Sequence, residues 1–190
     1  MRVNKKADTC DGMVLGFDWN KPYTNTGVSS QEMAPKGGPT ICSEKSGNLS
    51  MKRICVIDGQ GGGIGGTIIR ALKKTYGETI EILALGTNAI ATSQMMKAGA
   101  NRGATGENPV IRTVPVVDLI LGPIAISWPN AMMGEVTPRM AEAIASSRAR
   151  KVLIPLHQEN VSLVGASKEP LPHLVEAMVD EHIKEVLKDV

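Results

Sequence analysis

The chain has 190 residues and a formal net charge of +2, with 21 lysines and arginines against 19 aspartates and glutamates. Its few aromatic residues and lack of a basic block exclude a nucleic-acid surface built on base stacking. No apolar run reaches the ~18 residues of a membrane-spanning helix, and the N-terminus lacks the apolar core of a signal peptide. We therefore expect a cytoplasmic protein without a membrane partner, with the length of one α/β domain or of one domain plus a tail.

Residues 1–50 differ in composition from the rest of the chain. They are rich in Gly, Ser, Thr, Asn, Pro and Lys and follow neither helical nor strand periodicity, so we expect them to be disordered or weakly ordered. Met51 and the residues after it look like a natural protein start. We interpret residues 1–50 as an extension upstream of the native protein and residues 51–190 as the domain. A peptide arm anchored by Phe17 and Trp19 is the alternative.

The three cysteines give no sign of a metal site. They lie far apart, without Cys-x-x-Cys spacing and without a histidine nearby to complete a zinc site. Cys55 falls within an apolar run and is interpreted as a small buried hydrophobic residue. The sequence predicts no bound metal.

A glycine-rich loop is the most informative motif. The apolar run 54–57 before it and the helically spaced apolar residues after it predict a strand, a turn and a helix. Glycines leave room for a ligand, and a helix start offers unpaired amides and the positive end of the helix dipole. We therefore predict a nucleotide or phosphate site, with a tight turn that binds nothing as the alternative. Its residues are Asp58, Gly59, Gln60, Gly61, Gly62, Gly63, Ile64, Gly65, Gly66 and Thr67.

Three nucleotide-binding patterns overlap on this loop. Residues 61–66 fit the general dinucleotide pattern, residues 59–65 resemble the cofactor loop of short-chain dehydrogenases, and residues 62–67 resemble the deviant P-loop of ParA-like ATPases. The P-loop family has lysines where Gly61 and Gly66 stand here, which disfavours ATP hydrolysis. The Tyr-x-x-x-Lys motif of short-chain dehydrogenases is absent, which excludes that route of hydride transfer.

The second predicted strand, at residues 79–85, bears on the choice of nucleotide. Dinucleotide folds usually place an acidic residue at its end, where it binds the ribose 2′-hydroxyl. This chain has Gly86, Thr87 and Asn88 there, which disfavours NAD. Thr87 and Asn88 leave room for a 2′-phosphate, as in NADP, and a mononucleotide is equally compatible. The alternative for Thr87 is the N-cap of the helix predicted at residues 88–98.

The polar segment 100–109 is predicted to be a long loop at the ligand edge of the sheet. Arg102 is its candidate for binding a phosphate or carboxylate, with Glu107 and Asn108 as hydrogen-bonding groups. A solvated turn with Arg102 on the surface is the alternative.

A further strand is predicted at residues 116–121. The chain beyond it is expected beside the glycine loop, because the carboxyl ends of central strands form the crevice of a doubly wound sheet. There Trp128 either covers a planar ligand or packs in the core. Glu135, the one carboxylate of the segment, is a candidate polar group of the site, and a structural or exposed carboxylate is the alternative. The residues of this segment assigned to the site are Gly122, Pro123 and Asn130.

The strand predicted at residues 152–156 leads to the candidate catalytic residue. His157 follows it on the ligand side, and its titration near neutral pH suits a general acid or base. A surface or capping histidine is the alternative. A last strand is predicted at residues 161–165 and an amphipathic helix at residues 171–190.

Alternating strands and helices predict an α/β class, a Rossmann-like doubly wound three-layer sandwich with a mostly parallel sheet of five or six strands. Five segments together resemble a family of small bacterial proteins, common in Clostridia-like Firmicutes, known as domain of unknown function 3842. The resemblance covers residues 51–190 and implies a cytosolic Rossmann-like domain without a known activity. That family often has lysine where Gly66 stands. The segments are residues 57–65, 84–92, 103–108, 122–124 and 133–138.

Three functional hypotheses follow. The first is a domain that binds NADP or another nucleotide as a small-molecule partner, with a reductase as one form of it. The second is a non-enzymatic nucleotide sensor or assembly protein, with which a homo-oligomer is compatible. The third is a degenerate P-loop phosphotransfer enzyme, disfavoured by the missing lysines and by Asp118, which lies at the start of its strand.

Overall fold

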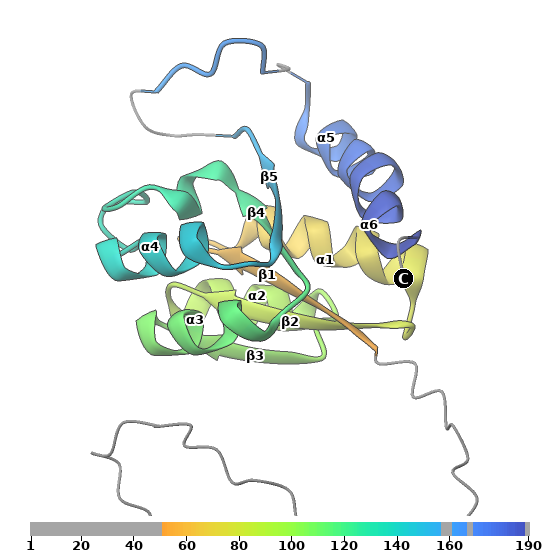
Figure 1. The fold of residues 1–190 in the computed structure, drawn as a ribbon, viewed down its shortest axis with the longest axis horizontal. Helices are drawn as coiled ribbons and strands as arrows, with labels where there is room; N and C mark the ends of the chain where they lie inside the picture. The colour runs from red at the N-terminus through yellow and green to blue at the C-terminus, as the bar shows by residue number, and fades with distance from the viewer. Residues whose placement is uncertain (1–50, 157–160, 167–168, 189–190) are drawn as a thin grey trace, which may run out of the picture. The chain divides into compact units, whose positions relative to one another are not determined.

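The computed structural model describes residues 51–156, 161–166 and 169–188. This part of the chain forms a five-stranded, wholly parallel sheet in the order β3-β2-β1-β4-β5 (Figure 1). The chain runs outward from β1 to β3 and then crosses back to β4, so the direction of winding reverses between β1 and β4. The predicted doubly wound α/β fold is confirmed. The strands are β1 (Lys52–Asp58), β2 (Ile80–Gly86), β3 (Arg102–Thr105), β4 (Leu119–Pro123) and β5 (Arg150–Ile154).

Helices cover both faces of the sheet. On one face, α1 (Gly63–Tyr76) packs beside the C-terminal helical segment, as Figure 1 shows, and α2 (Ala89–Lys97) belongs to the same layer. The other face carries α3 (Glu107–Thr113) and α4 (Pro138–Ser146). The C-terminal segment consists of α5 (Leu171–Ala177), the π-helical stretch η3 (Met178–Ile183) and α6 (Lys184–Lys188), and the 3₁₀ turns are η1 (Val114–Val116) and η2 (Ile124–Ser127).

The central strand shows why the sheet needs both layers. In β1, Ile54 and Val56 belong to the core cluster under α1, whereas Cys55 and Ile57 belong to the cluster under α3 and α4. None of the four is more than 1% exposed. A parallel strand buried on both faces has this continuous apolar character. The prediction that Cys55 is a buried hydrophobic residue is confirmed, and burial raises the pKa of its thiol.

Three predicted elements are corrected. The segment 100–109 is not a long loop, because β3 pairs with β2 there and α3 begins at Glu107. β4 begins three residues later than predicted, at Leu119, because the chain around Pro115 forms the turn η1. The predicted strand at residues 161–165 is wrong, because these residues form no strand and include a turn.

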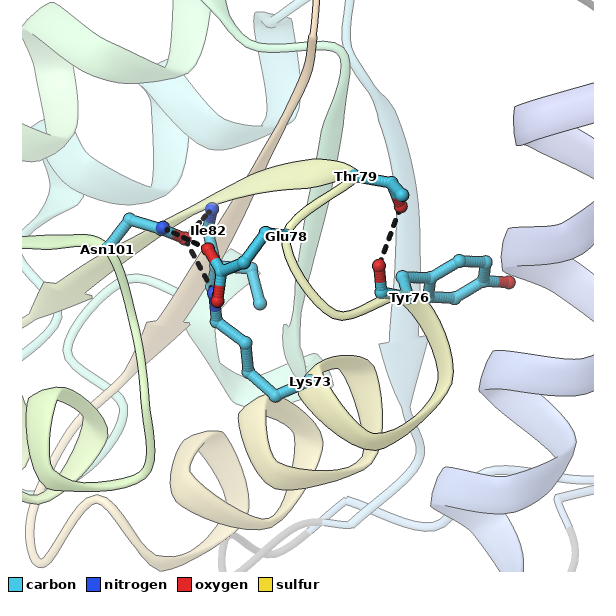
Figure 2. A network of polar contacts seen from close by, with 6 residues as sticks. All are labelled: Lys73, Tyr76, Glu78, Thr79, Ile82 and Asn101. Atoms are coloured by element: carbon cyan, nitrogen blue, oxygen red, sulfur yellow. Dashed lines mark hydrogen bonds and ion pairs between the residues drawn. The ribbon is translucent and has the colours of Figure 1, made fainter.

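A polar network joins α1 to β2 and to the start of β3 (Figure 2). The side-chain oxygen of Asn101 accepts hydrogen bonds from the backbone N–H of Ile82 at 2.9 Å and from Lys73 Nζ at 3.3 Å. The amide of Asn101 donates to Glu78, which also pairs with Lys73 at 2.9 Å. These contacts fix the end of α1 against β2 and the start of β3. The network lies near the amino ends of the strands, whereas the glycine loop lies at the carboxyl end of β1.

Candidate functional site

The inner side of the glycine loop binds a carboxylate of the chain itself. β1 ends at Asp58, which is 3% exposed. Its Oδ1 accepts from the N–H of Gly59 at 2.8 Å and its Oδ2 accepts from the N–H of Gly65 at 2.7 Å, and the neighbouring N–H of Ile64 also lowers the pKa of this carboxyl group. Ile64 and Gly65 lie in the first turn of α1, where the helix dipole favours negative charge. Asp58 therefore occupies the inner part of the predicted phosphate site.

This arrangement corrects part of the sequence prediction. Burial raises the pKa of the Asp58 carboxyl, the nearby charge of Glu135 adds to that, and the backbone hydrogen bonds lower it without cancelling the rise. Because the amides of Gly59 and Gly65 already donate to Asp58, they do not face a ligand.

A second carboxylate closes the loop from the other side. Glu135 comes from the connection between β4 and α4, and its Oε2 accepts from the N–H of Gln60 at 2.8 Å, from Thr87 Oγ1 at 2.5 Å and from Asn88 Nδ2 at 2.8 Å. Desolvation acts to raise the pKa of Glu135, but these hydrogen bonds outweigh it and leave the pKa below its usual value. No described residue donates to Oε1. Glu135 is therefore ionised at neutral pH and keeps one oxygen open.

Glu135 brings a carboxylate to the end of β2, where the sequence lacks one. Thr87 and Asn88, which follow β2, both donate to it from 48 and 47 residues away in the sequence. Thr87 is not the N-cap of α2. Asn88 has that role, since its Oδ1 accepts from the N–H of Ala91 at 2.8 Å. The distance along the chain explains why sequence patterns named Glu135 only as a polar candidate.

The glycines of the loop fall into two groups. The fold requires Gly59, Gly62 and Gly65: a Cβ would lie 2.5 Å from a threonine oxygen at Gly59 and 2.6 Å from a methionine sulfur at Gly65, and Gly62 has a φ of +68°. Gly61 and Gly63 are exposed, and a Cβ at either would meet no heavy atom within 4 Å. Within the described part of the chain, no acceptor bonds to their N–H groups. Packing therefore gives no reason for glycine at these two positions.

A cation lies beside the loop on the second turn of α1. Arg70 Nη2 donates to Thr67 Oγ1 at 3.1 Å, and its Nη1 lies 3.6 Å from the place that a Cβ would take at Gly66. The Thr67 hydroxyl in turn donates to the carbonyl oxygen of Gly63 at 2.8 Å. Sequence reasoning looked for lysines at 61 and 66 and missed Arg70. Its i, i+3 spacing from Thr67 was the signal.

The other predicted site residues come from β3, from α3 and from the segment between β4 and α4. Arg102 begins β3 and pairs with Glu81, so it lies away from the carboxyl ends of the strands, where it was expected. Asn108 is exposed in the first turn of α3. Asn130 is exposed at a φ of 63°, and its backbone N–H donates to a backbone carbonyl at 2.7 Å. His157 lies outside the described residues, so its predicted role stays a prediction.

The residues expected after β4 have packing roles. Gly122 allows close approach of strands, since a Cβ there would lie 2.3 Å from the carbonyl oxygen of Ile57. Pro123 is buried at the end of β4, and Trp128 packs against the core cluster under α3 and α4. Glu107 joins α3 to α4 by accepting from Thr137 Oγ1 at 2.6 Å and from an arginine of α4 at 2.9 Å.

Residues 53–187 match the model of a family described as Domain of unknown function (DUF3842). The chain belongs to this family. The DUF3842 match includes the glycine loop, Arg70 and Glu135 and leaves residues 1–52 outside it. No curated protein matches the chain. A crystal structure of a universal stress protein in complex with cAMP is similar at 19% identity and a TM-score of 0.32, covering 55% of this chain and 98% of that one. A likeness this low carries no functional argument.

Two further observations concern the described part of this DUF3842 chain. None of its helices combines the length and the apolar character that crossing a bilayer requires. Its His, Cys, Asp and Glu side chains form no group of three that could hold a metal ion.

Proposed function

We propose that this DUF3842 domain binds a nucleotide, with a phosphate at the outer edge of the glycine loop and the ribose at Glu135. The observation that carries the proposal is the pair of exposed glycines, Gly61 and Gly63, whose N–H groups have no acceptor among the described residues. Glycine is needed where a ligand approaches the backbone more closely than a Cβ permits. Here the fold offers no other reason for it.

Charge supports a phosphate at this edge. The two open amides lie at the start of a 14-residue helix, whose dipole attracts an anion. Arg70 supplies a positive charge next to Thr67 on the same helix, in place of the lysine of a P-loop. Asp58 holds the inner amides, so the phosphate would bind at the rim of the loop and not beneath it.

Glu135 supports a ribose with free hydroxyls. Its open Oε1 is an acceptor at the end of β2, the position where dinucleotide folds bind the ribose 2′-hydroxyl. A 2′-phosphate would face this carboxylate, and Thr87 and Asn88 already donate to it. We therefore favour a mononucleotide or NAD over NADP.

The loop is not arranged for phosphotransfer. P-loop enzymes cradle the transferred phosphates on backbone amides of the loop and the first helical turn. Here one loop amide, of Gly59, and one first-turn amide of α1, of Gly65, donate instead to Asp58. Our proposal is therefore reversible binding without phosphoryl transfer.

Thermal unfolding of the full chain with AMP, ATP, NAD and NADP tests this function. A ligand at 100 times its Kd adds about 2.7 kcal/mol of stability. We expect a clear shift with at least one nucleotide that has free ribose hydroxyls and a smaller shift with NADP. Gly63→Ala should leave the ligand-free protein equally stable or slightly more stable, because its Cβ meets no atom, and should abolish the ligand shift.

Arg70→Gln should weaken binding of the same nucleotide about tenfold, because it removes one charge-assisted contact. Lys74→Gln is the matched control, since Lys74 is exposed one turn further along α1 and should bind as wild type does. The proposal fails if none of the four nucleotides stabilises the chain, or if Gly63→Ala keeps the full shift.

A further inference from the structure

A groove of about 330 Å³ lies on the α3 face of the sheet, over β1, β2 and β3. Its volume is within the range of small-molecule sites in proteins. The groove is distinct from the glycine loop, none of whose residues lines it. Its lining residues are Arg53, Leu83, Leu85, Arg102, Gly103, Ala104, Thr113 and Val116.

The groove follows from the short helix over this part of the sheet. α3 has seven residues, about 10 Å of helix, and the 3₁₀ turn η1 follows it directly. The side chains of Leu83 and Ala104 on β2 and β3 are therefore only partly covered. Val116 in η1 is 56% exposed although it is apolar. Apolar surface thus remains open beside polar groups.

Two guanidinium groups line the groove. Arg102 on β3 forms an ion pair with Glu81 on β2, and Glu81 is the register partner of Arg53 on β1. The three side chains therefore lie on neighbouring strands, near the amino ends of those strands. One carboxylate between two arginines leaves one positive charge uncompensated. Within the described residues, the guanidinium of Arg53 has no hydrogen-bond or ion-pair partner. Nor does the hydroxyl of Thr113, which lines the same groove.

From this combination we infer a second binding site, for a small organic anion with an apolar body. Its carboxylate, sulfonate or phosphate would bind Arg53, with Thr113 as a further hydrogen-bond donor. Its hydrocarbon or aromatic part would cover Leu83, Ala104 and Val116 and remove their apolar surface from water. The ligand of the glycine loop differs in kind, since it is held by backbone amides and a ribose-binding carboxylate.

Anilinonaphthalene sulfonate is a suitable probe, because it joins a sulfonate to an apolar aromatic body and fluoresces when its surroundings become apolar. We expect the native full chain to bind it saturably with a stoichiometry of one. The uncharged analogue N-phenylnaphthylamine should bind at least about tenfold more weakly, because it lacks the group that Arg53 binds.

Variants test whether the probe lies in the groove. Arg53→Gln should weaken binding of the sulfonate about tenfold and leave the uncharged analogue unaffected. Ala104→Phe should weaken both probes, because it fills the groove. Arg112→Gln is the matched control, since Arg112 is exposed in the last turn of α3 but does not line the groove.

Three outcomes would overturn the inference. The first is sulfonate binding that is unchanged in both Arg53→Gln and Ala104→Phe. The second is displacement of the probe by AMP or NAD, which would place it at the glycine loop. The third is loss of probe binding as protein concentration rises, with dimers in sedimentation, because the groove would then be an interface between copies of this chain. Failure of all four nucleotides to bind would sink the proposed function and leave this site standing.

Discussion

Glu135 joins two other segments of the chain through one oxygen atom, Oε2, which accepts from Gln60 in the glycine loop and from Thr87 and Asn88 after β2. Glu135→Gln keeps the shape of the side chain but replaces a charged acceptor with a neutral one. We expect the free energy of unfolding to fall by about 1–2 kcal/mol at pH 7, the lower part of the range for charged hydrogen bonds because the site is partly exposed. Urea denaturation of both proteins measures this difference.

The stability difference between wild type and Glu135→Gln should shrink as the pH falls. The folded protein holds the pKa of Glu135 below its ordinary value of 4.5. The extra stability is therefore fully present above that value and is lost as the pH falls through the lower, folded-state pKa. Wild type and Glu135→Gln should therefore converge in stability once the pH lies below the folded-state pKa of Glu135. A constant difference between pH 7 and pH 3 would show that the charge of Glu135 is not the cause.

Substitution by alanine should change stability very differently at two glycines of the same loop. Gly62→Ala forces a Cβ onto a residue with a φ of +68°, 2.7 Å from the backbone of Ala91. We expect a loss of about 2 kcal/mol or more. Gly61→Ala should change stability by less than about 0.5 kcal/mol, because its Cβ meets open space. Equal losses in thermal unfolding would contradict the division of the loop into structural and open glycines.

The sequence predicted the parts of the site that are contiguous in the chain, but not the contacts between residues far apart in it. The glycine loop was recognisable because strand, glycines and helix are contiguous. The partners of the loop were not, since Glu135 reaches it from 75 residues beyond Gln60. Asp58 was assigned to the site, but its role as the internal acceptor depends on how the loop folds back over it. Arg102, which looked like an anion ligand, pairs with Glu81 on the neighbouring strand.

At the scale of elements, Asn101 takes the place of a backbone acceptor between β2 and β3. Asn101→Ala leaves the N–H of Ile82 without its side-chain partner and removes the contacts of Asn101 with Lys73 and Glu78 in the network of Figure 2. We expect a loss of about 1–2 kcal/mol in the free energy of unfolding, measured by urea denaturation. Asn108→Ala is the control, because none of the hydrogen bonds found among the described residues involves its side chain; a similar loss there would remove the explanation.

Long periodic elements could be predicted and short edge elements could not. The helix predicted after the glycine loop is α1, and the strand predicted at residues 79–85 lies within one residue of β2, because the apolar patterns of both are long. β3 has four residues, Arg102–Thr105, with two of them glycine or alanine and none strongly apolar. Pairing with the already formed β2 decides its conformation, and that information is not local.

At the scale of the whole molecule, the sheet and the family match define where the domain begins. β1 starts at Lys52, and the DUF3842 match starts at residue 53. We expect a chain that starts at Met51 to unfold at the same temperature as the full chain, within about 2 °C by calorimetry. A chain that starts at Gly59 lacks the central strand and should not fold. A large loss of stability on removing residues 1–50 would show that they belong to the domain.

The two carboxylates on the glycine loop also bear on kinetics. Asp58 and Glu135 fix the backbone of the loop through hydrogen bonds within the chain itself. A ligand arriving at its rim then orders no backbone, so little conformational entropy is lost on complex formation. Capture should follow a single bimolecular phase without a slow isomerisation, and related nucleotides should differ mainly in how long they stay bound.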